Sequence, residues 1–412
     1  MAAVSDFIDG ERLWQRLMQL ARFGETAEGG VDRPALSETE IAARAQLVAW
    51  ADEIGLDPYT DSLANLFLRL EGEDPNLPPL LIGSHIDSQP TGGRFDGVYG
   101  VLAALEVAEA FKSSGIVLKR AIEVVAWTNE EGSRFAPGMM GSAGYAGLRS
   151  VETIHALRDG AGTTAGEAIE RVLAHDRNIP QRSLKRSAFG YIEAHIEQGP
   201  ILENLGIPLG IVTGIQGKRT FRVTVKGEEN HAGTSPRSVR KDALVTAIAI
   251  IDALQKAVWD REDVVRFTIG HFAVSPNAPS VVPARVEFSI DLRHPDADTL
   301  IRLGDLVAPI AKGHTGPCAV EVTQLLHDAP LVFAEEMRDL LARVASASNF
   351  PAIEIASGAG HDARHLHAIC PTGMLFIPCW KGVSHHPSER IESDHALAGA
   401  KVLAQAVERL VG

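Results

Sequence analysis

Histidines and carboxylates gather in short motifs that follow predicted strands. His85 and Asp87 close a short apolar run that begins at Leu80, and Glu130 and Glu131 follow another apolar run. Imidazole and carboxylate groups bind hard or borderline divalent metals, and Asp87 is spaced to hold the His85 ring in one orientation. Adjacent carboxylates repel each other unless a cation or water relieves them. The pattern therefore predicts a metal site in which one glutamate binds the metal and the other acts as a base.

Three further residues extend this set: Asp96, His195 and His385. Asp96 lies in a glycine-rich turn before a helical pattern, where small neighbours let a carboxylate approach from the backbone side. His386 competes with His385, and composition does not rank the two. Taken singly, the motifs also suit a surface histidine beside a turn aspartate, a helix-capping aspartate or a solvated glutamate pair. The shared position of His85 and the glutamates at predicted strand ends favours the metal site.

The inserted part of the chain carries its own polar candidates, His231, Asn277 and Arg293. Arg293 ends a predicted strand in which alternate residues, from Val286 to Leu292, form an apolar face. A surface ion pair is the plainer interpretation of an arginine in this position.

Helical and strand patterns alternate along the first part of the chain. Apolar spacing predicts helices over 10–23, 37–54 and 98–111, and strand-like runs cover 80–83 and 121–127. A strand, a loop, a helix and a strand in this order imply a parallel crossover, and ligands of such sheets bind beyond the carboxyl ends of the strands. The first part is therefore predicted to be α/β.

From about residue 215 the pattern changes to the order βαββαβ of a ferredoxin-like unit. Its strands are predicted at 220–227, 263–272, 284–293 and 318–325, and its helices at 241–258 and 296–312. A helix, a strand and a last helix then return to the first sheet, at 333–348, 373–377 and 393–410. We therefore predict an α/β catalytic domain (1–214 and 329–412) with a mixed, largely parallel sheet flanked by helices, and an inserted domain (215–328).

Composition excludes several classes of function. The net charge of −14 repels phosphate backbones, and no cluster of basic residues interrupts it, which argues against nucleic-acid binding. No apolar run is long enough to span a membrane. The 3 cysteines are too few for a disulfide framework and lack metal-binding spacing, which fits a reducing compartment. A cytoplasmic location is expected.

Seven ordered motifs resemble the M20 family of metal-dependent amidohydrolases and aminopeptidases, specifically its hydantoinase/carbamoylase branch. The resemblance spans nearly the whole chain. The motifs are GSHIDSQPTGGRFDGVYG (83–100), WTNEEGSRFAPGMMGS (127–142), EAHIEQGPILE (193–203), GEENHAGTSP (227–236), IDLRHPD (290–296), SGAGHDA (357–363) and GVSHHPSE (382–389).

The resemblance implies two divalent metal ions that share Asp96. His85, Asp96 and His195 would hold one ion, and Asp96, Glu131 and His385 the other; the Ser-His-x-Pro pattern selects His385. Peptidase-like members commonly have a carboxylate where this chain has His195, so a histidine there resembles the carbamoylase branch. Zinc is the first expectation, with manganese, cobalt and nickel as alternatives, because such ligands accept each of them.

The resemblance also implies roles for the other candidates. Glu130 matches the general base, Asp87 the partner of His85, and a further set matches substrate-contacting positions: Gln198, His231, Asn277, Arg293, Gly360 and His361. His231 would in addition donate to the developing oxyanion. In related enzymes the inserted domain is both a lid and the contact of a homodimer.

The implied function is hydrolysis of the ureido C–N bond of a small N-carbamoyl-L-amino acid to the amino acid, ammonia and carbon dioxide. Allantoate amidohydrolase is an alternative that the motifs do not separate. Beta-ureidopropionase is another, because its substrate differs by one methylene, which changes binding by only roughly 1 to 3 kcal/mol. A metal-binding protein without catalysis is a more distant alternative, which would leave Glu130 without a role.

Overall fold

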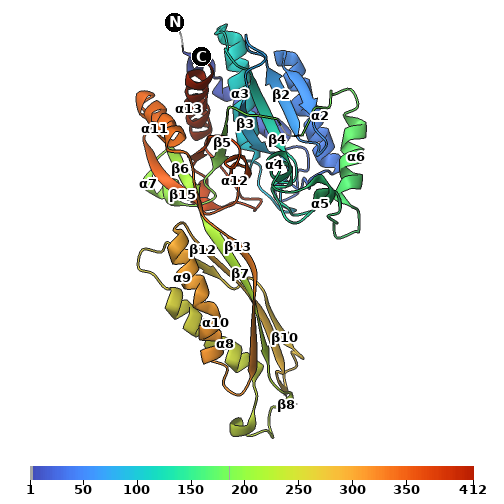
Figure 1. Ribbon diagram of the computed structural model, residues 1–412, viewed down its shortest axis with the longest axis vertical. Coiled ribbons are helices and arrows are strands. Elements are labelled where there is room, and N and C mark those ends of the chain that lie inside the picture. The colour runs from blue at the N-terminus through green and yellow to red at the C-terminus, as the bar shows by residue number, and fades with distance from the viewer. Residues whose placement is uncertain (1–2, 185) are drawn as a thin grey trace. The chain divides into compact units, whose positions relative to one another are not determined.

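The computed structural model describes residues 3–184 and 186–412 (Figure 1). The chain forms two compact units, the first made of residues 1–213 with 333–412 and the second of Gly214–Val332. Each unit has its own hydrophobic core.

The first unit is built on the larger sheet, in which the strands follow the order β1-β2-β4-β3-β5-β16-β6, and β15 pairs with β6. Residues 214–215 of β6 also pair with β14 at the start and end of the second unit. The strands are β1 (Asp57–Thr60), β2 (Leu66–Leu70), β3 (Leu80–His85), β4 (Ile122–Trp127), β5 (Gly190–Ile196), β6 (Leu209–Ile215), β14 (Leu331–Val332), β15 (Ala352–Ser357) and β16 (Thr372–Ile377).

The centre of this sheet is parallel and its flanks are antiparallel. Strand β3 pairs in parallel with β4 and β5, and β16 pairs in parallel with β5. Strands β2 and β6 pair antiparallel with β4 and β16. The predicted α/β class and the parallel crossover from β3 to β4 are confirmed, and the four central strands β4, β3, β5 and β16 pair in parallel with their neighbours among themselves.

Helices pack along the sheet, with α3 and α13 against its central strands and α1 against both helices. Helix α3 is buried on nearly all sides because it packs against the sheet as well as against other helices, which explains its apolar sequence. The helices of this unit are α1 (Gly10–Leu20), α2 (Glu38–Ile54), α3 (Val98–Ser114), α4 (Met140–Tyr145), α5 (Val151–His155), α6 (Ala165–His175), α7 (Ile201–Leu205), α11 (Glu335–Ala347), α12 (Ala363–Leu366) and α13 (Ser393–Val411), with the short 3-10 helices η1 (Val4–Phe7) and η3 (Trp380–Gly382).

The second unit has a sheet with the order β10-β12-β7-β13, and β9 also pairs with β12. Strand β12 pairs antiparallel with β10, β7 and β9, and β13 pairs antiparallel with β7. The apolar face predicted for β12 is buried, from Val286 to Leu292, and packs with α8 and α9 in one core. Its elements are β7 (Gly217–Lys226), β8 (Asn230–His231), η2 (Arg237–Val239), α8 (Ala243–Val258), β9 (Arg266–Thr268), β10 (Phe272–Ser275), β11 (Val281–Val282), β12 (Arg285–His294), α9 (Ala297–Asp305), α10 (Val307–Gly313) and β13 (Ala319–Asp328).

Two elements of this unit differ from the sequence prediction. The single helix expected over 296–312 is divided at Leu306 into α9 and α10. Pro309 has no backbone N–H to offer the carbonyl of Asp305, so the helical hydrogen-bond ladder is interrupted there. The strand expected over 263–272 is divided into β9 and β10. Among the described residues, no helix is both long and apolar enough to cross a membrane.

Candidate metal centre

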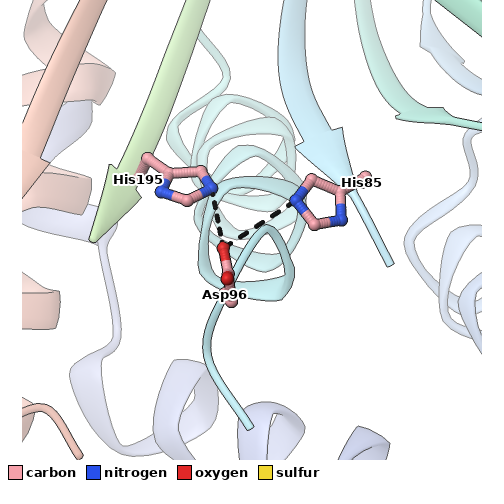
Figure 2. Close-up of side chains that lie close together, drawn as sticks. All are labelled: His85, Asp96 and His195. Atoms are coloured by element: carbon pink, nitrogen blue, oxygen red, sulfur yellow. Dashed lines mark ion pairs between the residues drawn. The ribbon is translucent and has the colours of Figure 1, made fainter. Parts of the chain in front are cut away.

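Three buried side chains meet beyond the carboxyl ends of the neighbouring strands β3 and β5 (Figure 2). His85 is the last residue of β3, His195 lies near the end of β5, and Asp96 lies in the loop that leads into α3. The Oδ1 atom of Asp96 is 3.1 Å from Nε2 of His195 and 3.9 Å from Nε2 of His85. Because parallel strands end at one edge of the sheet, residues 110 positions apart are brought into one cluster.

A second group of donors shares Asp96 through its other oxygen. The Oδ2 atom of Asp96 is 3.0 Å from Nε2 of His385, which is 3.3 Å from Oε2 of Glu131. The two oxygens of Asp96 thus face different groups, His85 and His195 on one side and His385 on the other. This is the arrangement that a carboxylate bridging two cations requires.

The imidazoles of the buried group are oriented by their second nitrogen. Nδ1 of His85 lies 3.0 Å from the carbonyl oxygen of Asp87, and Nδ1 of His195 lies 2.9 Å from the carbonyl oxygen of Ile196. Carbonyl oxygens only accept, so each Nδ1 carries a proton and Nε2 is the ring atom left to face Asp96 or a metal ion. Metal-binding histidines are commonly held in this way, and the donor set fits a borderline divalent metal.

Gly97 allows the two strands and the loop to approach each other this closely. Its φ is 66°, and a Cβ atom there would lie 2.4 Å from atoms of the His85 ring. Its backbone N–H donates to Nε2 of His195 at 3.2 Å. A side chain at this position would collide with a ring of the cluster, so the glycine is required by space as well as by backbone conformation.

Asp87 links the two glutamates to His85. Its Oδ1 and Oδ2 atoms accept the backbone N–H groups of Glu130 (3.1 Å) and Glu131 (3.2 Å), and its Oδ1 lies 3.5 Å from Nδ1 of His85. Oε2 of Glu130 lies 3.6 Å from Nε2 of His85, beside the cluster. Glu130 therefore stands at the cluster without belonging to either donor group.

The carboxylates of the site ionise differently. Burial raises the pKa of Glu130 well above its usual range; His85 opposes the shift, and the charges of Asp362 and Glu131 add to it. Burial also raises the pKa of Glu131 to about 7. For Asp96 burial acts in the same direction, but hydrogen bonds with His195 and His385 outweigh it and hold its pKa well below the usual range. Asp96 is therefore the stable anion of the site, and Glu130 is suited to hold a proton.

Three residues that sequence reasoning did not single out support the cluster. Glu389 accepts the backbone N–H groups of Phe95 (2.8 Å) and Asp96 (3.1 Å), and Ser384 donates to Oδ2 of Asp96 (3.0 Å) and to Glu389 (2.9 Å). Gln89 donates its side-chain N–H to Glu131 at 2.8 Å. Glu389 is nearly 300 residues from Asp96 in sequence, and its only signal was its place in the last motif.

The loops that carry the site hold three non-glycine residues in the left-handed region: Asn129 (φ 54°), Gln198 (φ 56°) and His385 (φ 55°). Such conformations are rare for residues other than glycine and gather at functional sites. Gln198 donates to Oδ2 of Asp96 at 2.9 Å, so this predicted substrate residue lies at the cluster.

The remaining candidates of the first unit lie beside His195 or near the surface. His361 is buried, and its ring centroid is 4.5 Å from that of His195. Gly360 is exposed, and a Cβ atom added there would lie 3.2 Å from the end of the Met139 side chain. His386 lies outside the donor groups found among the described residues, and its Nδ1 is 2.8 Å from the hydroxyl of Ser388.

The candidates of the second unit are more exposed. His231 lies in β8 and Asn277 in a loop with φ 58°, and both are exposed. Nδ1 of His231 accepts the backbone N–H groups of Gly233 and Thr234, so its proton is on Nε2. Arg293 is the penultimate residue of β12 and is half-buried, and its Nε and Nη2 atoms donate to the two oxygens of Asp291 at 2.9 and 3.1 Å.

Comparison with known proteins places this architecture in a family. The model of peptidase family M20/M25/M40 matches residues 81–409. The chain belongs to this family. It is 38% identical over 406 residues to an N-carbamoyl-L-amino acid amidohydrolase of Geobacillus stearothermophilus, with 98% of this chain and 99% of the relative covered. An allantoate amidohydrolase of Bacillus subtilis is 33% identical, with 95% of each chain covered.

A solved structure gives the same assignment. An amidase of the hydantoinase/carbamoylase family from Burkholderia multivorans superposes with a TM-score of 0.91 at 39% identity, over 98% of each chain. The resemblance stated from the motifs is therefore confirmed. This M20 enzyme is a hydrolase of C–N amide bonds from a metal-dependent family. Its clusters of histidine and carboxylate residues provide candidate metal ligands.

Proposed function

We propose that this M20 enzyme hydrolyses N-carbamoyl-L-amino acids to the amino acid, ammonia and carbon dioxide. The observation that carries the proposal is the pair of donor groups that share Asp96, with Glu130 beside them. Full-length relatives named N-carbamoyl-L-amino acid amidohydrolases, 35 to 38% identical, support the substrate class.

We further propose that two divalent ions bind, one at His85, Asp96 and His195 and the other at Asp96, Glu131 and His385. Zinc is the first candidate, and manganese, cobalt and nickel are alternatives for the same ligands. When bound, such ions polarise a carbonyl oxygen and lower the pKa of water.

The residues of the chain supply proton transfer. Glu130 takes a proton from the attacking water as the water oxygen bonds to the ureido carbon, and gives it to the leaving nitrogen as the C–N bond breaks. With the amino-acid nitrogen as the leaving group, the carbamic acid so formed breaks down to ammonia and carbon dioxide, which completes the balance of atoms. The raised pKa of Glu130 suits both steps, because the group must hold the proton between them.

The second unit supplies candidate substrate contacts. Nε2–H of His231 is a donor suited to the developing oxyanion, a contribution of about 3 kcal/mol for one well-placed donor. The guanidinium of Arg293 suits a bidentate contact with the substrate carboxylate, to which Asn277 would add a hydrogen bond. In the first unit, Gln198, Gly360 and His361 are proposed as further substrate contacts.

A panel of ureido substrates tests the proposal. N-carbamoyl-L-amino acids, N-carbamoyl-β-alanine and allantoate are offered to the enzyme and ammonia release is measured. We expect the highest kcat/KM for an N-carbamoyl-L-amino acid. Preferred turnover of allantoate would move the assignment to allantoate amidohydrolase, and preferred turnover of N-carbamoyl-β-alanine to beta-ureidopropionase. Metal binding without turnover of any of them would leave a non-catalytic protein.

We also propose that the second unit acts as a lid and as the contact of a homodimer, with some of His231, Asn277 and Arg293 acting on the partner's substrate. Its sheet ends in the edge strand β13, on which Leu325 and Leu326 are exposed. Mixing the variants Glu130→Gln and His231→Ala under subunit exchange should then raise activity above that of either variant alone, through sites in the heterodimers that combine an intact Glu130 with an intact His231. A fully active monomer at all concentrations would exclude the dimer.

A further inference from the structure

Glu193 is a fully buried carboxylate in the middle of β5, on a strand that carries a candidate metal ligand. Ile192 and Ala194 belong to the main core, so Glu193 and His195 lie on the opposite face of the strand. Burying a carboxylate is costly unless hydrogen bonds satisfy it, and a structural role alone would be served by an apolar residue. The hydrogen bonds of Glu193 explain why a carboxylate is buried at this position.

Each oxygen of Glu193 accepts a hydrogen bond from a different segment. Oε1 accepts the hydroxyl of Ser84 at 2.6 Å, and Ser84 directly precedes His85 at the end of β3. Oε2 accepts the backbone N–H of Ala363 at 2.9 Å, the first residue of α12. The loop 357–363 before it is closed by the contact of Ser357 with Nε2 of His361 at 2.8 Å.

These bonds replace strand pairing where it has ended. Within the part of the chain that the structure describes, β3 pairs with β5 only as far as Ile82 and Ile192, so the ladder stops before His85 and His195. The bond from Ser84 to Glu193 joins the two strands beyond that point. The bond from Ala363 joins the same side chain to the segment that follows His361, whose ring packs on His195.

We propose that Glu193 is a positioning residue that ties together the ends of β3 and β5 and the loop 357–363, and so sets the spacing of His85 and His195. The inference rests on the proposed metal centre, of which it concerns only the ion held by His85, Asp96 and His195. Glu131 and His385 lie on other segments, so the second ion should depend little on Glu193.

Two substitutions of Glu193 distinguish the effect of its hydrogen bonds from the effect of its negative charge. Glu193→Met keeps an unbranched side chain of similar length but removes both bonds. Glu193→Gln removes the charge but can keep both bonds, since its carbonyl accepts Ala363 N–H and its amide donates to Ser84. Glu106→Met is the matched control, because Glu106 is equally buried and is bonded to Arg12 and Asp9, neither of which is a candidate ligand.

The experiment titrates the metal-free full chain with Zn²⁺ in competition with a chromogenic chelator, and measures both the number of ions and their affinities. Removing a group that orients metal ligands typically lowers affinity roughly 10- to 100-fold. We expect Glu193→Met to lower the affinity of one ion by that factor and to leave the other within about threefold. We expect Glu193→Gln and Glu106→Met to bind both ions nearly as the wild type does.

Several results would contradict the proposed positioning role of Glu193. They are unchanged affinities in Glu193→Met, an equal loss in Glu193→Gln, or an equal weakening of both ions. If Glu193→Met does not fold, Ser84→Ala decides: a loss confined to one ion supports the link between β3 and β5, and wild-type affinities refute it. A wild-type protein that binds no ion would instead refute the proposed metal centre.

Discussion

The buried candidate ligands of the first unit and the candidate substrate residues of the second unit differ in how firmly they are held; His385, also a candidate ligand, is exposed. His85, Asp96 and His195 are 1%, 6% and 1% exposed, and each is bonded to further groups, whereas His231 and Asn277 are exposed. A buried, hydrogen-bonded cluster keeps its geometry without substrate. Changes to the first set should therefore abolish function, and changes to the second set should weaken it by degrees.

The largest effect is expected from removal of metal. Dialysis against a strong chelator should abolish ureido hydrolysis, because the carbonyl would lose its polarising cation. Adding back Zn²⁺ or Mn²⁺ should restore it, with ammonia release as the measurement. Full activity in protein shown by elemental analysis to be metal-free would contradict the proposed centre.

The next effect concerns Glu130, which lies at the cluster but outside both donor groups. Glu130→Gln should lower kcat by roughly a thousandfold or more, because general acid–base catalysis and the coupled transfer are both lost. Its metal content should equal that of the wild type. Near wild-type turnover would show that another group is the base.

A graded effect is expected at Arg293. Arg293→Ala should lower kcat/KM by more than roughly tenfold, a loss of about 2 to 3 kcal/mol, which is the order for a charge-assisted hydrogen bond. Arg293→Lys should recover little, because a point charge cannot reproduce the planar fork. Carboxamide analogues of the substrate are the control: if the wild type turns over acid and amide equally, Arg293 does not bind the carboxylate.

The smallest effect is expected at Asp291, which pairs with Arg293 and also with Lys218 at 3.0 Å. Asp291→Asn should leave Arg293 less well oriented and raise KM by roughly threefold at constant kcat, as expected for a partly exposed ion pair. Steady-state kinetics of the variant measure its KM and kcat. A KM below that of the wild type would mean that Asp291 competes with the substrate for the guanidinium.

The sequence predicted several elements with a clear apolar period, and in one that it missed, buried polar residues hide that period. Helices α3 and α13 and strand β4 were predicted close to their bounds. Strand β5 was not predicted, because Glu193 and His195 interrupt an otherwise apolar segment and are nevertheless buried. The polar residues that obscured the strand are those that serve the site.

The sequence motifs predicted the candidate site, but they did not predict the contacts that support it. His85, Asp96 and Glu131 stand in distinctive motifs, and the structure brings them together with His195 and His385. The bonds from Phe95 and Asp96 to Glu389 join distant parts of the chain, and no local pattern encodes them. Long-range hydrogen bonds of this kind depend on the folded geometry alone.

The left-handed residues Asn129, Gln198 and His385 have a consequence for engineering the enzyme. Their backbones are held in a costly conformation by the loops around them, so substitutions nearby are expected to be tolerated poorly. Libraries meant to broaden substrate range should therefore leave these loops unchanged. Randomising the neighbours of His231 and Arg293 in the second unit, neither of which has a left-handed backbone, should leave the metal cluster intact.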